Sequence, residues 1–250
     1  MPTEVAHGVY SIGQGHVEIY VIEDGGRLTL VDSGLKSDWK RINSEVTAMG
    51  KTLADIEAVI LTHSHLDHMG NAERLRKEAG AAVHVHQDDL AQARGGERPA
   101  RDPKARSMLS YGPSILITIV QFALRGGLSS PPPIIEAATF TDGKVLEVPG
   151  RPKVVHVPGH TPGSSALFLE DRGVLFTGDA LISYTFFGRK TGARISPSIS
   201  NEDTAEALRS LANIESLPAQ IVLPGHGAPL NEGVDAAVEA ARRIGSDAKD

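Results

Sequence analysis

The feature that most constrains this chain is a cluster of metal-ligand side chains in the segment 63–68, His-Ser-His-Leu-Asp-His. One residue, Thr62, separates it from residues 58–61, Ala-Val-Ile-Leu, a short apolar run typical of a buried strand. In an extended segment, residues two apart project to the same side, so His63 and His65 can reach one metal ion together. The Asp-His pair that ends the segment lies where the chain turns into a helix, and it can reach a second ion. Imidazole nitrogens with a carboxylate suit Zn²⁺ and other borderline transition metals.

The alternative is a polar loop that contains histidines by chance. Four ligand-type residues within six positions, directly after an apolar strand, argue against it. Three later residues strengthen the metal interpretation: His160, Asp179 and His226 each follow an apolar run and are flanked by Gly or Pro. A lone histidine is more often structural, but strand ends followed by turns are where folds place functional side chains. Together these residues suffice for two ions that share one carboxylate.

Apolar periodicity predicts an α/β fold in which each half of the chain runs strands first and then helices. Two similar sheets packed between helices would suit that order. The expected strands cover residues 8–12, 17–23, 28–31, 58–61, 82–86, 145–148, 154–157, 166–169, 174–176 and 221–223. The expected helices cover residues 38–49, 71–78, 113–124, 202–213 and 233–244. We expect one domain over residues 1–250, with an inserted, lid-like helical segment at about 101–137.

This arrangement of ligand-type residues strongly resembles the metallo-β-lactamase fold superfamily, whose pattern is HxHxDH, a distant His, an Asp and a final His. The resemblance runs from Tyr10 to about Leu230. It implies a four-layer αβ/βα sandwich, with two mixed β-sheets flanked by helices and the metals at the edge between the sheets.

The resemblance also implies roles for individual residues. One metal would be held by His63, His65 and His160, the other by Asp67, His68 and His226, and Asp179 would bridge them. Asp32, in the segment Leu-Val-Asp-Ser-Gly at 30–34, would support the ligands from behind. A hydroxide held between the metals would attack a polarised carbonyl, and Asp67 would accept or orient the proton of the water as a catalytic residue.

Departures from the pattern narrow the choice within the superfamily. Many β-lactamases of this fold use a cysteine ligand, and this chain has no cysteine. The complete seven-ligand set is more similar to glyoxalase II-type thioesterases and lactonases. We therefore expect an enzyme that cleaves an ester, thioester or lactone bond. It would use two divalent transition-metal ions, which we expect to be Zn, with Fe or Mn as alternatives. A mononuclear-iron sulfur dioxygenase, β-lactam hydrolysis as a minor activity and a non-catalytic metal-binding relative are the alternatives.

Composition limits the partners. The chain has 25 basic and 31 acidic residues and a net charge of −6, which argues against binding a nucleic-acid backbone. No signal-peptide pattern precedes the first strand, and no apolar run approaches the roughly 20 residues that a membrane span needs. We therefore expect a cytoplasmic enzyme that acts on a small molecule and has no membrane span.

If the segment 113–124 is a helix, apolar residues lie on almost all of its surface. A helix that packs through one face only would have a wide polar side, so we expect this one to be covered on more than one side. We expect a lid in which Ile119 and Phe122 line a substrate pocket. A core helix and the interface of a homodimer are the alternatives. Tyr184, Phe186 and Phe187 lie close after Asp179 and are candidates for the pocket wall. Such a pocket favours a substrate with an apolar portion. His84 and His86 repeat the His-x-His spacing without a following Asp-His pair, and we expect them to be structural.

Overall fold

The computed structural model describes residues 2–13, 16–97, 100–107, 110, 116, 119–120, 123–124, 130–185 and 190–246. Its larger sheet has seven strands in chain order: β1 (Thr3–Ala6), β2 (Val9–Ser11), β3 (Tyr20–Asp24), β4 (Arg27–Val31), β5 (Ile56–Ile60), β6 (Ala82–His86) and β7 (Ala138–Phe140). The first four strands pair antiparallel, and β4 to β7 pair in parallel.

The second sheet has four strands in the order β13-β10-β9-β8. Their bounds are β8 (Lys153–His156), β9 (Ser165–Leu169), β10 (Val174–Gly178) and β13 (Ile221–Pro224). Only the β10–β13 pair is parallel, so this sheet is also mixed. A separate hairpin pairs β11 (Ile182–Thr185) with β12 (Lys190–Arg194).

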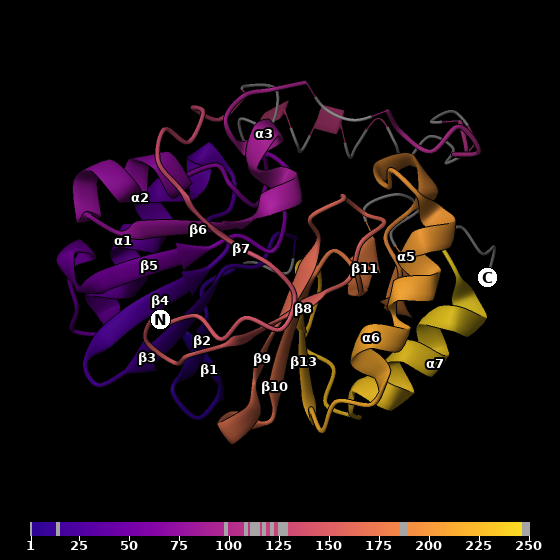
Figure 1. The fold of residues 1–250 in the computed structure, drawn as a ribbon. Helices are drawn as coiled ribbons and strands as arrows, with labels where there is room; N and C mark the ends of the chain where they lie inside the picture. Colours follow the sequence, from indigo (N-terminus) through magenta and orange to yellow (C-terminus); the bar gives the residue numbers. More distant parts are fainter. Residues whose placement is uncertain are drawn as a thin grey trace.

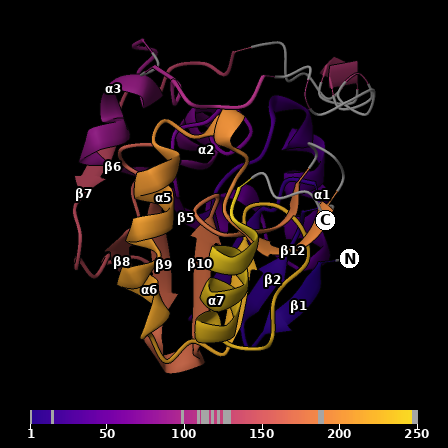
Figure 2. The ribbon, with the colours of Figure 1, turned by 90° about the vertical axis from the view of Figure 1, so that its right-hand side faces the viewer.

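Helices cover the two outer faces of the sheets (Figure 1). On the N-terminal side they are α1 (Trp39–Ala48), α2 (Ala72–Ala79) and the short α3 (Leu90–Ala93); on the C-terminal side they are α5 (Thr204–Ser210), α6 (Ala212–Glu215) and α7 (Val234–Ile244). Figure 2 shows α5, α6 and α7 in front of the second sheet. Single 3-10 turns cover Lys36–Asp38, Leu53–Asp55, Gln87–Asp89, Glu170–Arg172 and Ser198–Ser200. Within the described part of the chain, no helix is long and apolar enough to cross a bilayer.

Three buried apolar clusters lie between four layers. Successive residues of a strand point to opposite faces, and Leu175 in β10 packs towards the C-terminal helices, while its neighbours Val174 and Phe176 pack towards the other sheet. In β3, likewise, Val21 packs with α1 and α2, and Ile22 packs between the sheets. Each sheet is therefore apolar on both faces, and the four-layer αβ/βα sandwich is confirmed.

The structure corrects some expected elements. Residues 145–148 form no strand; Val145 makes one isolated bridge to Lys153, while Leu146 and Val148 are buried between the sheets. The helix expected over 202–213 is two short helices, α5 and α6. The structure adds β1, β7, α3 and the β11–β12 hairpin. The helix expected over 113–124 lies largely outside the described residues.

Candidate metal centre

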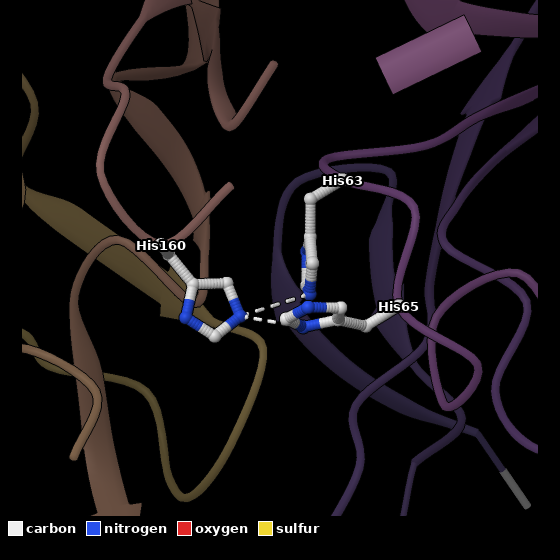
Figure 3. Close-up of side chains that lie close together, drawn as sticks. All are labelled: His63, His65 and His160. Carbon is white, nitrogen blue, oxygen red and sulfur yellow. Dashed lines mark hydrogen bonds between the residues drawn. The ribbon is translucent and has the colours of Figure 1, made fainter. Parts of the chain in front are cut away.

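The seven candidate ligands all follow the carboxyl ends of strands. The His63–His68 segment comes after β5 in the larger sheet. In the other sheet, His160 follows β8, Asp179 follows β10 directly and His226 follows β13. Both sheets therefore contribute candidate ligands to one site. Figure 3 shows His160 facing His63 and His65 from the opposite half of the chain.

Three imidazoles converge on one point. Nε2 of His160 lies 3.2 Å from Nε2 of His63 and 2.8 Å from Nδ1 of His65 (Figure 3). Two nitrogens that bind one Zn²⁺ at about 2.0–2.1 Å in tetrahedral geometry lie roughly 3.3 Å apart. The spacing of these rings therefore suits a single ion.

A second group contains Asp67, His68 and His226, whose ligand atoms lie within 4.8 Å of one another. Asp179 contacts both groups. Its Oδ2 lies 3.4 Å from Nε2 of His160 in the first group and 3.2 Å from Nε2 of His226 in the second. Its Oδ1 lies 3.4 Å from Nε2 of His68. This carboxylate therefore lies between the two groups.

Hydrogen bonds at Nδ1 orient most of these rings. Nδ1 of His160 lies 3.0 Å from Oδ1 of Asn201, an amide oxygen that only accepts, so the ring carries its proton there. Nδ1 of His68 faces the Asp32 carboxylate at 2.8 Å, and that of His63 faces the Thr62 hydroxyl at 3.1 Å. Nδ1 of His226 donates to the backbone oxygen of His16. In each of these four rings the contact at Nδ1 leaves Nε2 facing the other candidate ligands, which is the arrangement that metal-binding histidines favour.

Charges divide the site into two halves. Burial would lower the pKa of His68, but the carboxylates of Asp32, Asp179 and Asp67 outweigh it and raise the pKa to about 10. Burial and the neighbouring imidazoles hold the pKa of His63 well below its usual value. Burial would raise the pKa of Asp179, but His226 and His68 hold it well below its usual range. The carboxylate half thus attracts positive charge, and His63 stays neutral, the form in which imidazole binds a metal.

Three observations indicate that these side chains suit divalent ions. Nε2 of His68 and Oδ1 of Asp179 are fully buried, and they form no hydrogen bond with any described residue, although they face each other at 3.4 Å. Leaving a buried polar atom without a hydrogen bond costs about 1–3 kcal/mol. Gly225 leaves the space beside them open: a Cβ there would lie 2.4 Å from Oδ1 of Asp179 and 2.8 Å from Cε1 of His68. The donor set of imidazole nitrogens and carboxylate oxygens matches Zn²⁺ and its neighbours.

A further group of ligand-type side chains, His86, Asp88 and His156, lies apart from these seven. The rings of His86 and His156 stack face to face, with centroids 4.3 Å apart and planes 9° apart. Because a nitrogen lone pair lies in its own ring plane, two parallel stacked rings do not direct their lone pairs at one ion. His84, in the same strand, is half-buried, and burial lowers its pKa.

Only two of the five predicted pocket residues, Tyr184 and Ile119, lie in the described part of the chain. Tyr184 is half-buried, and its ring meets that of His16 edge-on at 5.9 Å, beside His226. Ile119 is 44% exposed. Phe122, Phe186 and Phe187 lie outside the described residues, so the lid stays a prediction.

Three supporting residues escaped the sequence analysis. Asn201 accepts a hydrogen bond from the ring of His160, and the backbone oxygen of His16 accepts one from the ring of His226. Asp89 accepts hydrogen bonds from two loops that carry candidate ligands, through Ser64, Thr161 and Gly163. Their contacts join positions 25 or more residues apart, so no local spacing could have indicated them.

Comparison with known families supports the same assignment. The model of the family described as "Metallo-beta-lactamase superfamily" matches residues 12–226. The chain belongs to this superfamily. It is therefore related to metallo-hydrolases, and the His63–His68 segment, Asp179 and His226 all fall within the matched region.

Relatives in the metallo-beta-lactamase superfamily cover most of the chain. It is 27% identical to the probable metallo-hydrolase YflN of Bacillus subtilis (strain 168), over 91% of this chain and 86% of that protein. It is also 27% identical to the atrochrysone carboxyl ACP thioesterase of Aspergillus fumigatus, over 84% of this chain and 50% of that one. The crystal structure of the metallo-beta-lactamase family protein TTHA1429 of Thermus thermophilus has a TM-score of 0.68 at 23% identity. The match covers 95% of this chain and 79% of that one, which shows a shared fold.

Proposed function

We propose that this protein hydrolyses an acyl bond of a small molecule with the help of two divalent transition-metal ions, most favourably Zn²⁺. The observation that carries the proposal is the position of Asp179, whose carboxylate contacts nitrogen atoms of both histidine groups. A single ion would leave one of these groups unused. Metal ions in such a pair lower the pKa of a water molecule and polarise a carbonyl group.

The residues of the chain then have separate tasks. His63, His65 and His160 would hold one ion, and Asp67, His68 and His226 the other. Asp67 has a side chain 18% exposed, the most open of the carboxylates at the centre, with Oδ2 3.6 Å from Nε2 of His226. We assign to Asp67 the additional role of orienting the attacking water and accepting its proton. Asp32 would keep the ring of His68 in place.

The bond we propose is an ester, thioester or lactone, as in glyoxalase II-like and lactonase members of the superfamily. Two observations support this class. The ligand set is complete without a cysteine, and one relative is named as an atrochrysone carboxyl ACP thioesterase. The Tyr184–His16 pair beside His226 offers an aromatic surface, which supports a substrate with an apolar portion.

Metal analysis combined with a substrate panel tests the proposal. The purified protein should contain close to two transition-metal ions per chain and hydrolyse an aryl ester, an acyl thioester or a lactone faster than a β-lactam. One iron per chain, with oxidation of a persulfide and no hydrolysis, would instead show the sulfur dioxygenase. Metal binding without turnover of any member of the panel would leave only a binding role.

The variant Asp179→Ala should lose at least one ion and lower kcat/KM by more than the roughly 10–100-fold typical of residues that only support a ligand. Asp171→Ala, which removes an exposed carboxylate away from the histidines, is the matched control. Two ions and full turnover in Asp179→Ala would contradict the two-ion site.

A further inference from the structure

Asp89 ends the turn after β6, and the residue is 1% exposed. Three donors surround it. Oδ2 accepts from the backbone N–H of Ser64 at 2.8 Å and from the hydroxyl of Thr161 at 2.9 Å, and Oδ1 accepts from the backbone N–H of Gly163 at 2.7 Å. Hydrogen bonds to an ionised carboxylate are about twice as strong as neutral ones. Asp89 is therefore a firm anchor for the backbone around it.

The two segments that Asp89 holds come from different halves of the molecule. Ser64 lies between His63 and His65, after β5 of the larger sheet. Thr161 directly follows His160, in the loop between β8 and β9 of the other sheet. Asp89 thus bonds to the chain neighbours of all three histidines in the first group.

Close approach of the second segment depends on a glycine. A Cβ on Gly163 would lie 2.6 Å from Cγ and from Oδ1 of Asp89. Gly163 is not among the glycines with positive φ, so the absence of a side chain serves the contact with Asp89 and not an unusual backbone conformation.

We propose that Asp89 is a positioning residue that sets the distance between His160 and the His63–His65 pair, and so determines the metal affinity of the three-histidine group. The inference rests on the proposed function. Asp89 acts on the other group only indirectly, because its three hydrogen bonds go to neighbours of His63, His65 and His160 and not to neighbours of Asp67, His68 or His226.

The test is a Zn²⁺ titration of the full chain against a chromophoric chelator, which gives two stepwise dissociation constants. His65→Ala identifies the step that belongs to the three-histidine group, because that step is lost. Asp89→Asn keeps the shape of the side chain but turns an NH₂ group towards N–H or O–H donors. It should weaken the same step about tenfold or more, within the range found for residues that support metal ligands, and leave the other step within about threefold.

Two further variants separate positioning from a general structural role. Gly163→Ala keeps the carboxylate but displaces it, and it should weaken the same step. Asp88→Asn, on the adjacent exposed residue, should change neither step. Equal weakening of both steps in Asp89→Asn, or an unchanged three-histidine step in Asp89→Asn or Gly163→Ala, would overturn the proposal. A wild-type chain that binds no Zn²⁺ would overturn the proposed function instead.

Discussion

Oδ2 of Asp32 lies 2.8 Å from Nδ1 of His68, and both side chains are buried. The same carboxylate accepts from the backbone N–H and the hydroxyl of Thr62, each at 2.8 Å. Asp32 has a φ of 61°, a left-handed conformation that Asp and Asn tolerate better than other residues with a side chain. One residue thus fixes the end of β5 and the ring that faces the carboxylates.

We expect Asp32→Asn to weaken metal binding roughly 10–100-fold. Asparagine suits the same backbone conformation but lacks the negative charge opposite His68. Dissociation constants for Zn²⁺, measured by competition with a chelator, test this, with Asp171→Asn as the control. Unchanged affinity would show that Asp32 only stabilises the fold.

Gly225→Ala should impair metal binding although it alters no ligand. The added Cβ would lie 2.4 Å from Oδ1 of Asp179 and force that carboxylate or the ring of His68 to move. We expect less than one full complement of metal after dialysis against metal-free buffer, measured by elemental analysis. Wild-type metal content with wild-type kcat/KM would contradict the placement of Gly225 against the centre.

Metal removal should reduce both activity and stability. An ion that binds only the folded chain and is present at about a thousand times its Kd contributes about 4 kcal/mol. For a chain of this size that corresponds to a fall in Tm of roughly 8–16 °C. Calorimetry before and after chelation measures it, and added Zn²⁺ should restore both Tm and turnover. An unchanged Tm with unchanged turnover after complete removal would exclude a metal role.

Glu73 should make stability depend on pH in the acid range. The hydrogen bonds from Arg76 are the main reason that the pKa of this buried carboxylate falls from 4.5 to about 2. Because the folded pKa is the lower one, the stabilisation is present above pH 4.5 and is lost as the pH falls towards 2. Glu73→Gln should cost roughly 1–3 kcal/mol at neutral pH and flatten the acid limb of the stability curve, measured by urea unfolding.

Glu78→Gln is the matched control for Glu73, since Glu78 pairs with Arg74 at 2.7 Å on the surface of the same helix. Exposed pairs contribute at most about 1 kcal/mol. Equal losses in the two variants would show that burial of Glu73 adds nothing to its interaction with Arg76.

The lid prediction concerns substrates of different chain length. If Ile119 and Phe122 cover the acyl chain, Ile119→Ala and Phe122→Ala should lower kcat/KM more for long than for short substrates. Each buried methylene is worth about 0.8 kcal/mol, or roughly fourfold. Leu124→Ala, at a position 81% exposed, is the control. Equal losses for long and short substrates would rule out the lid.

Local patterns predicted most of the strands and helices. The strand expected at 82–86 has the bounds of β6, and the helix expected at 233–244 differs from α7 by one residue. Residues 145–148 have the pattern of a strand although they form none, because Leu146 and Val148 lie on either side of a polar residue and are buried. The turn that follows, with Gly150 at a φ of 86° and Arg151 at 45°, leaves only the isolated bridge of Val145 to Lys153.

The clustering of the candidate ligands was predictable because their spacing is local in the His63–His68 segment and because each later candidate is flanked by Gly or Pro. The supporting residues were not, since a buried Asp or Asn has no distinct sequence pattern: Asp89 follows a strand, and Asn201 lies 41 residues from His160. The homodimer and the cytoplasmic location stay predictions.

The division of the candidate ligands between two sheets has a consequence for biosynthesis. The first half of the chain provides His63 and His65 but not the third histidine of their group, and it provides Asp67 and His68 without His226. A nascent chain on the ribosome can therefore complete neither group until both sheets have emerged and docked. Capture of the first ion would come after translation of His160 and capture of the second after translation of His226, so the supply of metal would govern the final maturation of the protein rather than the early steps of its folding.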